Sequence, residues 1–263
     1  MKRDAATDYF SIKDISINFG GIRALDKINC DVTKGEIFGI VGPNGSGKTT
    51  TFNCINRIYN IDEGEILFKG NKLHKMKSFN ICNLGIARTF QNIELFSNMT
   101  CLENILVGCH QKMSAGLVQR VLFLPSAKEE ELKARARAEW LVDFLELQPA
   151  REQVVSKFPV GVQKLVELGR ALATEPEILL LDEPASGMNV EEREELALRI
   201  IELRKHFGLT IILIDHDLRL VMDICDRVMV LNFGAKIAEG KPQDIQKDPK
   251  VQKAYVGEDK DIG

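Results

Sequence analysis

Residues 42–49 read Gly-Pro-Asn-Gly-Ser-Gly-Lys-Thr and directly follow the apolar run Ile37–Val41. This spacing matches the pattern Gly-x-x-x-x-Gly-Lys-Ser/Thr, in which glycines let backbone N–H groups wrap around a phosphate. A strand before the segment and a helix over about Lys48–Ile55 would aim the positive end of that helix at the phosphate. The segment therefore predicts a nucleotide-binding α/β fold, and by itself it fits kinases, GTPases and transport ATPases equally.

This phosphate loop should supply most of the contacts to a nucleotide such as ATP. Lys48 would bring positive charge to the β- and γ-phosphates, and the Thr49 hydroxyl would bind Mg²⁺. The other residues of the loop that we expect to contact the nucleotide are Asn44, Gly45, Ser46, Gly47 and Thr50.

Two other apolar runs, Ile178–Leu181 and Thr210–Ile214, have the composition of buried parallel strands. The first is followed by Asp182-Glu183-Pro184, and the second by Asp215-His216-Asp217. Because ligands bind at the carboxyl ends of parallel strands, we expect these segments and the phosphate loop to form one site.

The two acids after the second strand suit different roles. A carboxylate at the end of a buried strand is costly unless it is paired or close to a cation, so Asp182 is a candidate Mg²⁺ ligand, bound through water. Glu183 is placed to act as general base on the attacking water. The competing interpretation is a strand end with two solvated acids.

Gln91 is a candidate ligand of the nucleotide and of Mg²⁺, and His216 is the second candidate catalytic residue beside Glu183. The amide of Gln91 could touch both Mg²⁺ and the water, although a glutamine after a strand is usually a turn residue. A neutral His216 could hydrogen-bond the γ-phosphate or order the water beside Glu183, although a single histidine is more often structural. No comparable context surrounds the other histidines, His74, His110 and His206.

An aromatic residue, Phe19, lies upstream of the loop, where its ring could stack on adenine. The alternative is an ordinary core aromatic at the end of a strand. Around it, Tyr9–Phe19, Leu25–Val32 and Glu65–Phe68 are short strand-like pieces divided by glycine turns, which predicts an antiparallel sheet beside the parallel core.

Between Gln91 and Lys157 the pattern becomes helical. Ser126–Leu147 is charged and periodic, and its apolar face should comprise Leu132, Ala136, Trp140, Leu141 and Phe144. Later, Arg227–Glu239 predicts a hairpin with its turn at Asn232-Phe233-Gly234, and a short helix should span Pro242–Tyr255.

These patterns predict one α/β domain with a mostly parallel sheet, an N-terminal antiparallel β-subdomain and an inserted α-helical subdomain. The core with its β-subdomain should comprise residues 1–90 and 158–240. Residues 91–157 should form the helical subdomain, and residues 241–263 a C-terminal helix and tail.

The composition further narrows the classes of function that the chain can have. The 263 residues carry a net charge of -3, which gives no reason to expect nucleic-acid binding. No apolar run approaches the roughly 18 residues of a membrane span, and the polar start with Asp4 and Asp8 is not a secretory signal. We therefore expect a cytosolic protein that is soluble when isolated, whose six scattered cysteines are small hydrophobic residues rather than disulfides or zinc ligands.

The ordered set of Phe19, phosphate loop, Gln91, helical insert, Asp182-Glu183 and His216 resembles the nucleotide-binding subunits of ABC transporters over nearly the whole chain. Their signature, usually Leu-Ser-Gly-Gly-Gln, corresponds here to residues 158–163, Phe-Pro-Val-Gly-Val-Gln, which we call the signature segment. In the family this segment faces the γ-phosphate that the partner subunit holds. The resemblance therefore implies that two ATP molecules lie between two such chains.

Within the signature segment, Pro159 suits a first helical position but cannot supply the hydroxyl or N–H of a serine. Gly161 keeps close backbone approach to phosphate, and the helix dipole remains. A lost charge-assisted hydrogen bond typically costs about 1.5 to 3 kcal/mol, which is enough to make two composite ATP sites unequal.

A proline at this position is similar to one branch of the family, the ATPases of branched-chain amino-acid importers. Residues 85–92, 182–189 and the tail 253–258 also resemble that branch. The branch usually has Leu-Pro-Tyr-Gly, from which Phe158 and Val160 depart, and Asn189 replaces a frequent aspartate in the segment expected to reach the partner's site.

The resemblance implies an importer in which this chain pairs with a second, related ATPase, or with its own copy, at the cytoplasmic face of the membrane. The pair would dock under two transmembrane permease subunits, whose coupling helices the helical insert would receive. A binding protein outside the cell would deliver the substrate. ATP binding would close the pair and hydrolysis would reopen it.

Three alternatives remain at this stage. The first is a soluble ABC ATPase of translation or DNA repair, although those usually carry two cassettes or a long coiled coil. The second keeps the transporter and changes its cargo to urea, short amides or a lipid. The third is a P-loop kinase or GTPase, but the sequence contains no base-specific motif or lid motif that supports it.

Overall fold

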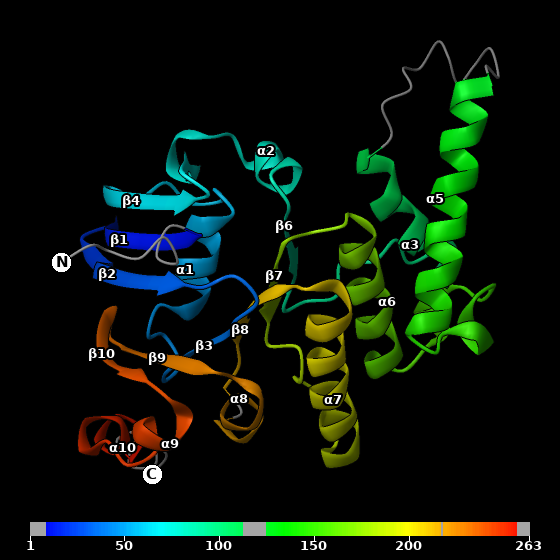
Figure 1. Ribbon diagram of the computed structural model, residues 1–263. Helices are drawn as coiled ribbons and strands as arrows, with labels where there is room; N and C mark the ends of the chain where they lie inside the picture. Colours follow the sequence, from blue (N-terminus) through cyan, green and yellow to red (C-terminus); the bar gives the residue numbers. More distant parts are fainter. Residues whose placement is uncertain (1–8, 113–124, 217, 257–263) are drawn as a thin grey trace.

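The computed structural model describes residues 9–112, 125–216 and 218–256. Two sheets and the helices around them make up the fold (Figure 1). The four-stranded sheet has the order β2-β1-β4-β5 and comprises β1 Phe10–Phe19, β2 Ile22–Val32, β4 Glu63–Phe68 and β5 Asn71–Lys72. The six-stranded sheet has the order β10-β9-β3-β8-β7-β6 and comprises β3 Ile37–Val41, β6 Ile86–Thr89, β7 Ile178–Asp182, β8 Thr210–Ile214, β9 Arg227–Asn232 and β10 Ala235–Gly240.

The larger sheet is parallel except for its edge hairpin β9–β10. Every residue of β3, β7 and β8 is buried, as expected of strands covered on both faces. The three predicted parallel strands and the predicted hairpin are therefore confirmed. The hairpin turns at Phe233 and Gly234, which both have positive φ.

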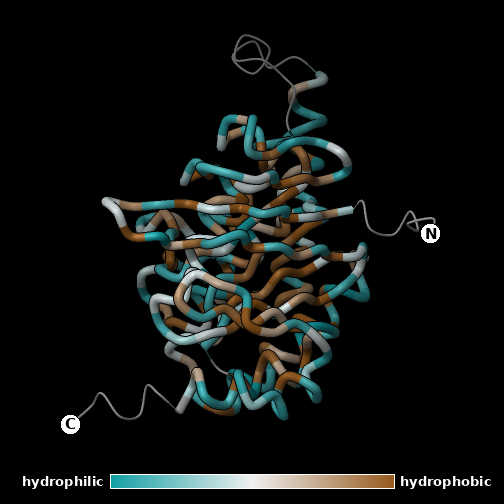
Figure 2. Tube along the Cα trace, turned by 90° about the vertical axis from the view of Figure 1, so that its left-hand side faces the viewer, coloured by the Kyte–Doolittle hydropathy of each residue, from teal (hydrophilic) through white to brown (hydrophobic). Residues whose placement is uncertain are grey.

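The smaller sheet is antiparallel, as predicted. Its inward side chains, such as Phe10 and Ile66, share one apolar core with Phe38 of β3 and Phe52 of the helix α1, Lys48–Ile55. Helix α1 lies beside both sheets in Figure 1. In Figure 2, hydrophobic stretches of the backbone run through the middle of the molecule. The phosphate loop therefore leads into a helix that is fixed by the core.

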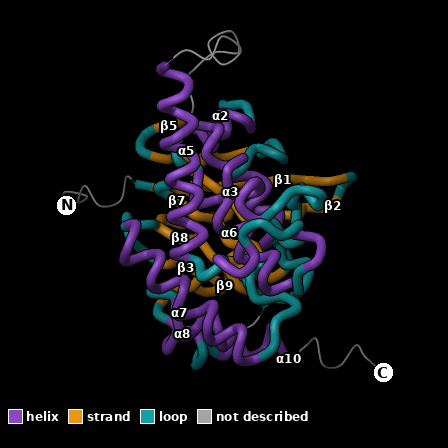
Figure 3. The backbone as a smooth tube through the Cα atoms, turned by 90° about the vertical axis from the view of Figure 1, so that its right-hand side faces the viewer, coloured by secondary structure: helices purple, strands orange, loops and turns teal. Residues whose placement is uncertain are grey.

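Helices cover the other face of the large sheet (Figure 3). The longer ones are α3 Cys101–Cys109, α5 Pro125–Phe144, α6 Val160–Ala173 and α7 Val190–Phe207, and α8 Leu218–Ile224 is a shorter one. The short helix α2 Ser78–Asn83 instead places Ile81 in the core shared with the small sheet. Helix α6 packs closely on α3, because a Cβ at Gly108 would lie 2.2 Å from the carbonyl oxygen of Arg170. Within the described residues, no helix combines the length and the apolar composition that a membrane span requires.

The predicted apolar face of α5 was wrong in part. The buried residues of this helix are Ala127, Ala134, Ala138, Leu141 and Val142. Leu132 is 60% exposed, Ala136 is also exposed, and Trp140 and Phe144 pack instead against His206 and Phe207 at the end of α7. Ala134 and Ala138 belong to the core shared with the neighbouring helices, whereas the alanine that the prediction placed on this face, Ala136, is exposed.

The C-terminal segment also differs from its prediction. A single helix was expected over Pro242–Tyr255, but two are present, α9 Pro242–Ile245 and α10 Pro249–Val256. Pro249 begins a new helix because a proline has no N–H to continue the preceding one, and it disfavours helical geometry in the residue before it. The predicted tail beyond residue 256 and Asp217 lie outside the described residues.

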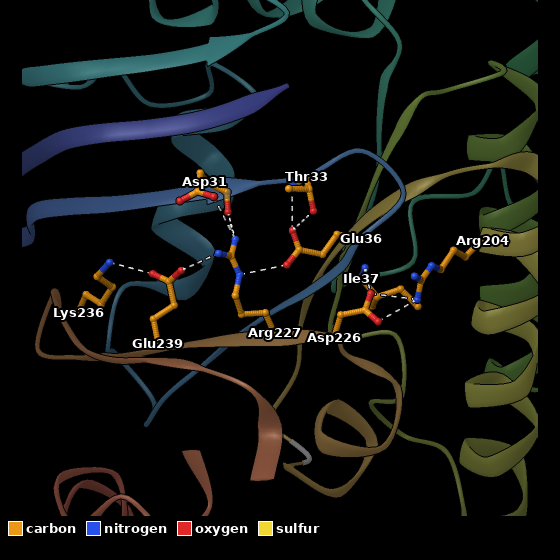
Figure 4. A network of polar contacts seen from close by, with 9 residues as sticks. All are labelled: Asp31, Thr33, Glu36, Ile37, Arg204, Asp226, Arg227, Lys236 and Glu239. Carbon is orange, nitrogen blue, oxygen red and sulfur yellow. Dashed lines mark hydrogen bonds and ion pairs between the residues drawn. The ribbon is translucent and has the colours of Figure 1, made fainter. Parts of the chain in front are cut away.

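Polar contacts tie the edge of the large sheet to the small sheet (Figure 4). The guanidinium of Arg227 on β9 contacts three carboxylates, those of Asp31, Glu36 and Glu239. Nearby, Asp226 accepts a hydrogen bond from the backbone N–H of Ile37 and pairs with Arg204 on α7. These contacts fix β3, the strand that leads into the phosphate loop.

All six cysteines are free, five of them buried and Cys82 half-buried. Burial raises the pKa of the Cys30 and Cys54 thiols to about 12, which keeps both thiols protonated near neutral pH. The five buried cysteines belong to the two apolar cores, as predicted, whereas Cys82 lies outside both cores and donates a hydrogen bond to Gln111.

Candidate functional site

The phosphate loop connects β3 to α1 and needs glycine at two positions for steric reasons. A Cβ at Gly42 would lie 2.1 Å from the carbonyl oxygen of Leu231. Gly47, the N-cap of α1, has φ 105°, and its Cβ would lie 2.6 Å from Leu25. The loop is thus pressed against both the β9–β10 hairpin and β2, which fixes its backbone N–H groups in place.

Lys48 lies over this loop and is only 5% exposed. Its Nζ donates to the carbonyl oxygens of Gly42, at 2.7 Å, and Pro43, at 2.9 Å. The neighbouring Ser46 hydroxyl is buried and has no hydrogen-bond partner among the described residues. A buried donor of this kind suits an anionic ligand, because phosphate oxygens would satisfy it.

The other loop candidates lie where a ligand can reach them. Thr49 and Thr50 begin α1 and are half-buried, whereas Asn44 and Gly45 are exposed at the tip of the loop. The hydroxyl of Thr49 and the open loop tip are therefore accessible to a bound nucleotide.

Asp182 ends β7 and is 1% exposed. Its Oδ2 accepts a hydrogen bond from Arg88 Nη2 at 2.6 Å, while its Oδ1 is buried without a hydrogen-bond partner among the described residues. Burial raises the pKa of this carboxyl, and Arg88 and Lys48 oppose the rise. The unpartnered oxygen is what a water-mediated cation ligand would offer.

Arg88 is a residue of the site that sequence analysis missed. It lies on β6, beside β7, and its Nη1 also donates to Asn53 of α1 at 2.7 Å. Its guanidinium lies over the rings of Phe52 and Phe90. Because the pairing joins positions 94 residues apart, the available signal was a charged residue within a short strand that begins with two apolar residues.

Three predicted catalytic residues converge from three strand ends. Glu183 Oε2 accepts a hydrogen bond from Gln91 Nε2 at 3.0 Å and lies 3.4 Å from His216 Nδ1. The Glu183 side chain is 12% exposed and that of His216 is 56% exposed. A solvent-facing carboxylate between an amide and an imidazole has the geometry to accept a proton from water.

The backbone of Glu183 is constrained. Its φ is 46°, a left-handed conformation that is uncommon for a residue other than glycine. Its N–H donates to Ile214 at the end of β8, at 2.7 Å. Buried Asp215 accepts from the N–H of Ala185 at 3.3 Å, so two consecutive residues at the end of β8 hold the segment that follows β7.

Phe19 is not a core residue, because it is 42% exposed. Its ring makes an edge contact with Tyr59, with 5.0 Å between the ring centroids. The neighbouring Asn18 is held by Asp62, which accepts from both its backbone and its side-chain N–H. Tyr59 was not identified from the sequence, since no motif marks it.

The signature segment forms the start of α6. Pro159 is the N-cap and not the first helical residue that the sequence suggested, with ψ 155° and no side-chain capping bond. Val160 is 46% exposed, and a Cβ at Gly161 would lie 3.4 Å from Glu192 of α7. Asn189 caps α7 through a reciprocal pair of hydrogen bonds with Glu192. Both helix starts therefore lie at one surface.

Known proteins match this chain over most of its length. The family model described as ABC transporter matches residues 25–186, and one described as branched-chain amino acid ATP-binding cassette transporter matches residues 235–261. The high-affinity branched-chain amino acid transport ATP-binding protein LivG of Escherichia coli (strain K12) is 41% identical over 249 residues, covering 94% of this chain and 97% of LivG.

Solved structures of ABC transporter cassettes are also similar to this chain. An ATP-binding cassette of an ABC transporter in its ADP conformation superposes with a TM-score of 0.82 at 32% identity, covering 95% of this chain and 98% of that one. A dimeric bacterial ABC transporter cassette gives a TM-score of 0.75 at 25% identity, covering 89% and 98%. The chain belongs to the ABC transporter family, and it is an ATPase that takes ATP as its nucleotide.

Proposed function

We propose that this chain is the ATP-hydrolysing subunit of an importer for branched-chain amino acids, bound at the cytoplasmic face of the membrane through permease subunits. The cargo is supported by the likeness to LivG and by the branch-specific match over residues 235–261. The observation that carries the catalytic part is the meeting of Gln91, Glu183 and His216 beside the phosphate loop.

In this proposal the loop backbone and the Lys48 ammonium bind the β- and γ-phosphates, together with Ser46. Thr49, Gln91 and the free Oδ1 of Asp182 form a set of oxygen donors that fits Mg²⁺. When bound, the ion neutralises charge on the phosphate oxygens. Arg88 pairs with Oδ2 of Asp182 and opposes the rise that burial causes in the pKa of this carboxyl, and Oδ1 lies outside the ion pair.

Glu183 then acts as the general base. The attacking water forms a bond to the γ-phosphorus and gives its proton to Oε2 of Glu183, while the bond between the γ-phosphorus and the bridging oxygen breaks and ADP leaves. Gln91 and His216 contact the same carboxylate oxygen and orient both it and the water. Phe19, held beside Tyr59, stacks on adenine.

The partner subunit is a second ATPase of the same class, as the dimeric relative supports. The exposed start of α6, with Gly161, would face the partner's γ-phosphate, and Asn189 would lie at the same interface. Helix N-termini favour anions, so the segment retains attraction for phosphate although Pro159 contributes no N–H.

We propose that the permease subunits dock into a groove on the surface of this chain. A groove of about 370 Å³ lies between α2, β6, α3 and α6 and is lined by Ile81, Arg88, Phe90, Gly108 and Arg170 among others. Phe90 is next to Gln91, so a permease helix seated in this groove would touch the segment that reaches the catalytic carboxylate. This continuity favours the groove as the place where transport and hydrolysis are coupled.

The test compares wild type with Glu183→Gln in membrane vesicles that contain the permease subunits and the second ATPase. We expect ATP-dependent uptake of labelled leucine, isoleucine or valine by wild type, and a loss of turnover of roughly 10²- to 10⁴-fold in the variant, because a general base typically contributes that factor. ATP binding, measured by calorimetry, should persist.

Glu202→Gln, which neutralises an exposed acid on α7, is the matched control and should leave uptake unchanged. Uptake of urea rather than of these amino acids would overturn the cargo. Near-normal hydrolysis by Glu183→Gln would remove Glu183 as the base.

A further inference from the structure

Helix α6 begins at the signature segment and also touches the catalytic turn of its own chain. Lys164, in its second turn, is half-buried, and its Nζ donates to three carbonyl oxygens of one short segment. These are the oxygens of Glu183 at 3.0 Å, Pro184 at 3.1 Å and Ser186 at 2.7 Å. A single ammonium thus gathers the carbonyls of the turn that carries the proposed base.

This turn needs such support. Glu183 adopts φ 46°, which costs free energy in a residue with a Cβ and persists only when surrounding contacts impose it. The backbone contacts on the turn come from Ile214 on one side and from the Ser186 N–H, which donates to the Glu183 carbonyl at 3.1 Å. Lys164 supplies the contact from the opposite layer, that of the helices.

A second residue of α6 contacts the other catalytic segment. Glu167, one turn beyond Lys164, is 3% exposed and accepts a hydrogen bond from the backbone N–H of Phe90 at 3.3 Å. Phe90 directly precedes Gln91, whose amide binds Glu183. Neighbouring positions on one face of α6 therefore hold the backbone of Phe90, which precedes Gln91, and the backbone of Glu183.

We propose that Lys164 is a positioning residue for the general base: it fixes the carbonyls of residues 183–186 and thereby holds the Glu183 carboxylate at Gln91 and His216. The inference rests on the proposed role of Glu183. Because α6 begins at the signature segment, the helix that would face the partner's nucleotide also sets the geometry of the base in its own site.

Lys164→Met removes the ammonium and keeps a long side chain of similar volume. We expect kcat for ATP hydrolysis to fall roughly tenfold or more, because displacement of a catalytic group by about 1 Å can cost about 100-fold. KM and calorimetric ATP affinity should change by less than about twofold, since the phosphate loop is untouched. Lys205→Met, at an exposed position on α7, is the matched control and should not change either constant.

Combining the substitution with Glu183→Gln separates positioning from general destabilisation. If Lys164 acts through Glu183, Lys164→Met should cause no further loss of rate in the Glu183→Gln background, because residues that act as a unit are not additive. The same fold-loss in both backgrounds would overturn the inference. Normal turnover by Glu183→Gln alone would overturn the proposed base instead.

A measurement without nucleotide provides the second readout. Amide hydrogen exchange in peptides covering residues 183–188 should be faster in Lys164→Met than in wild type, whereas exchange in the phosphate loop should be unchanged. Unchanged exchange over residues 183–188 would show that Lys164 does not hold the turn, whatever the variant's activity.

Discussion

The catalytic half of the site and the signature segment differ in what they contact within this chain. Gln91, Glu183 and His216 come from three strand ends, and Gln91 and His216 each lie within 3.4 Å of Oε2 of Glu183. Pro159 and Val160 instead lie at the surface, and Pro159 makes no side-chain capping bond. The fold itself assembles the catalytic half, whereas the signature segment places the start of α6 at the surface.

The two halves therefore depend on different interactions for their stability and binding. The catalytic half rests on buried charges that are paired across the sheet, above all Arg88 with Asp182, whose side chains are 5% and 1% exposed. The signature segment rests on backbone N–H groups and a helix dipole, which gain value only against an anion. Substitutions should therefore lower folding stability in the first half and association in the second.

The largest effect is expected from Arg88→Met, which breaks the catalytic half. Removing one partner of a buried ion pair leaves an uncompensated charge and typically costs about 3 to 5 kcal/mol. Urea denaturation should show this loss in the free energy of unfolding. ATP binding by the remaining folded protein should also weaken, since Asn53 of α1 loses its contact with Arg88.

Arg23→Met is the matched control, because Arg23 pairs with Asp26 at a surface where both side chains are more than 40% exposed. Exposed pairs contribute about 0 to 1 kcal/mol, so this variant should unfold almost as wild type does. Equal losses in the two variants would contradict the view that burial makes the Arg88 pair important.

Pro159→Ser should strengthen ATP-dependent association through the signature segment and leave the catalytic half unchanged. Serine restores a backbone N–H and a hydroxyl at the start of α6, and a hydrogen bond to a charged group contributes about 1.5 to 3 kcal/mol. We expect ATP-dependent association of the Glu183→Gln chain to tighten by roughly 10- to 100-fold. Sedimentation velocity with and without ATP would measure it.

The stability of the Pro159→Ser monomer should stay close to that of its parent, because the changed position is exposed. Pro149→Ser, at an exposed proline remote from the signature segment, is the control and should leave association as it is. Tighter association without ATP would indicate a contact that does not involve phosphate.

The difference between local patterns and long-range contacts explains which parts of the site could be predicted from the sequence. The phosphate loop and the strand-end residues were predictable because a short local pattern determines where a strand ends and which way the chain turns. Arg88 and Lys164 could not be assigned, since their partners lie in other elements and only the packed fold brings them together. The predicted face of α5 was partly wrong for a related reason: the helix carries several alanines, and only the packed fold shows that Ala134 and Ala138, rather than Ala136, lie in the core.

The smallest effect concerns the contact between the two halves, the buried Glu167 of α6. Burial raises the pKa of this carboxyl from its ordinary value of 4.5. As the pH falls, the native state takes up this proton before the unfolded chain does, so the group adds stability on acidification and loses it as the pH rises through the native pKa. In Glu167→Gln this contribution is absent, and the wild-type advantage in unfolding free energy should grow in urea titrations as the pH is lowered from neutral toward 4.5.

Glu103→Gln supplies a control of opposite sign. A hydrogen bond from the Thr100 backbone lowers the pKa of Glu103 from 4.5 in the capping box of α3, so the wild-type advantage over this variant should shrink only as the pH falls below 4.5. A wild-type advantage over Glu167→Gln that stays constant with pH would show that Glu167 is solvated in the native protein and does not link α6 to the segment of Gln91.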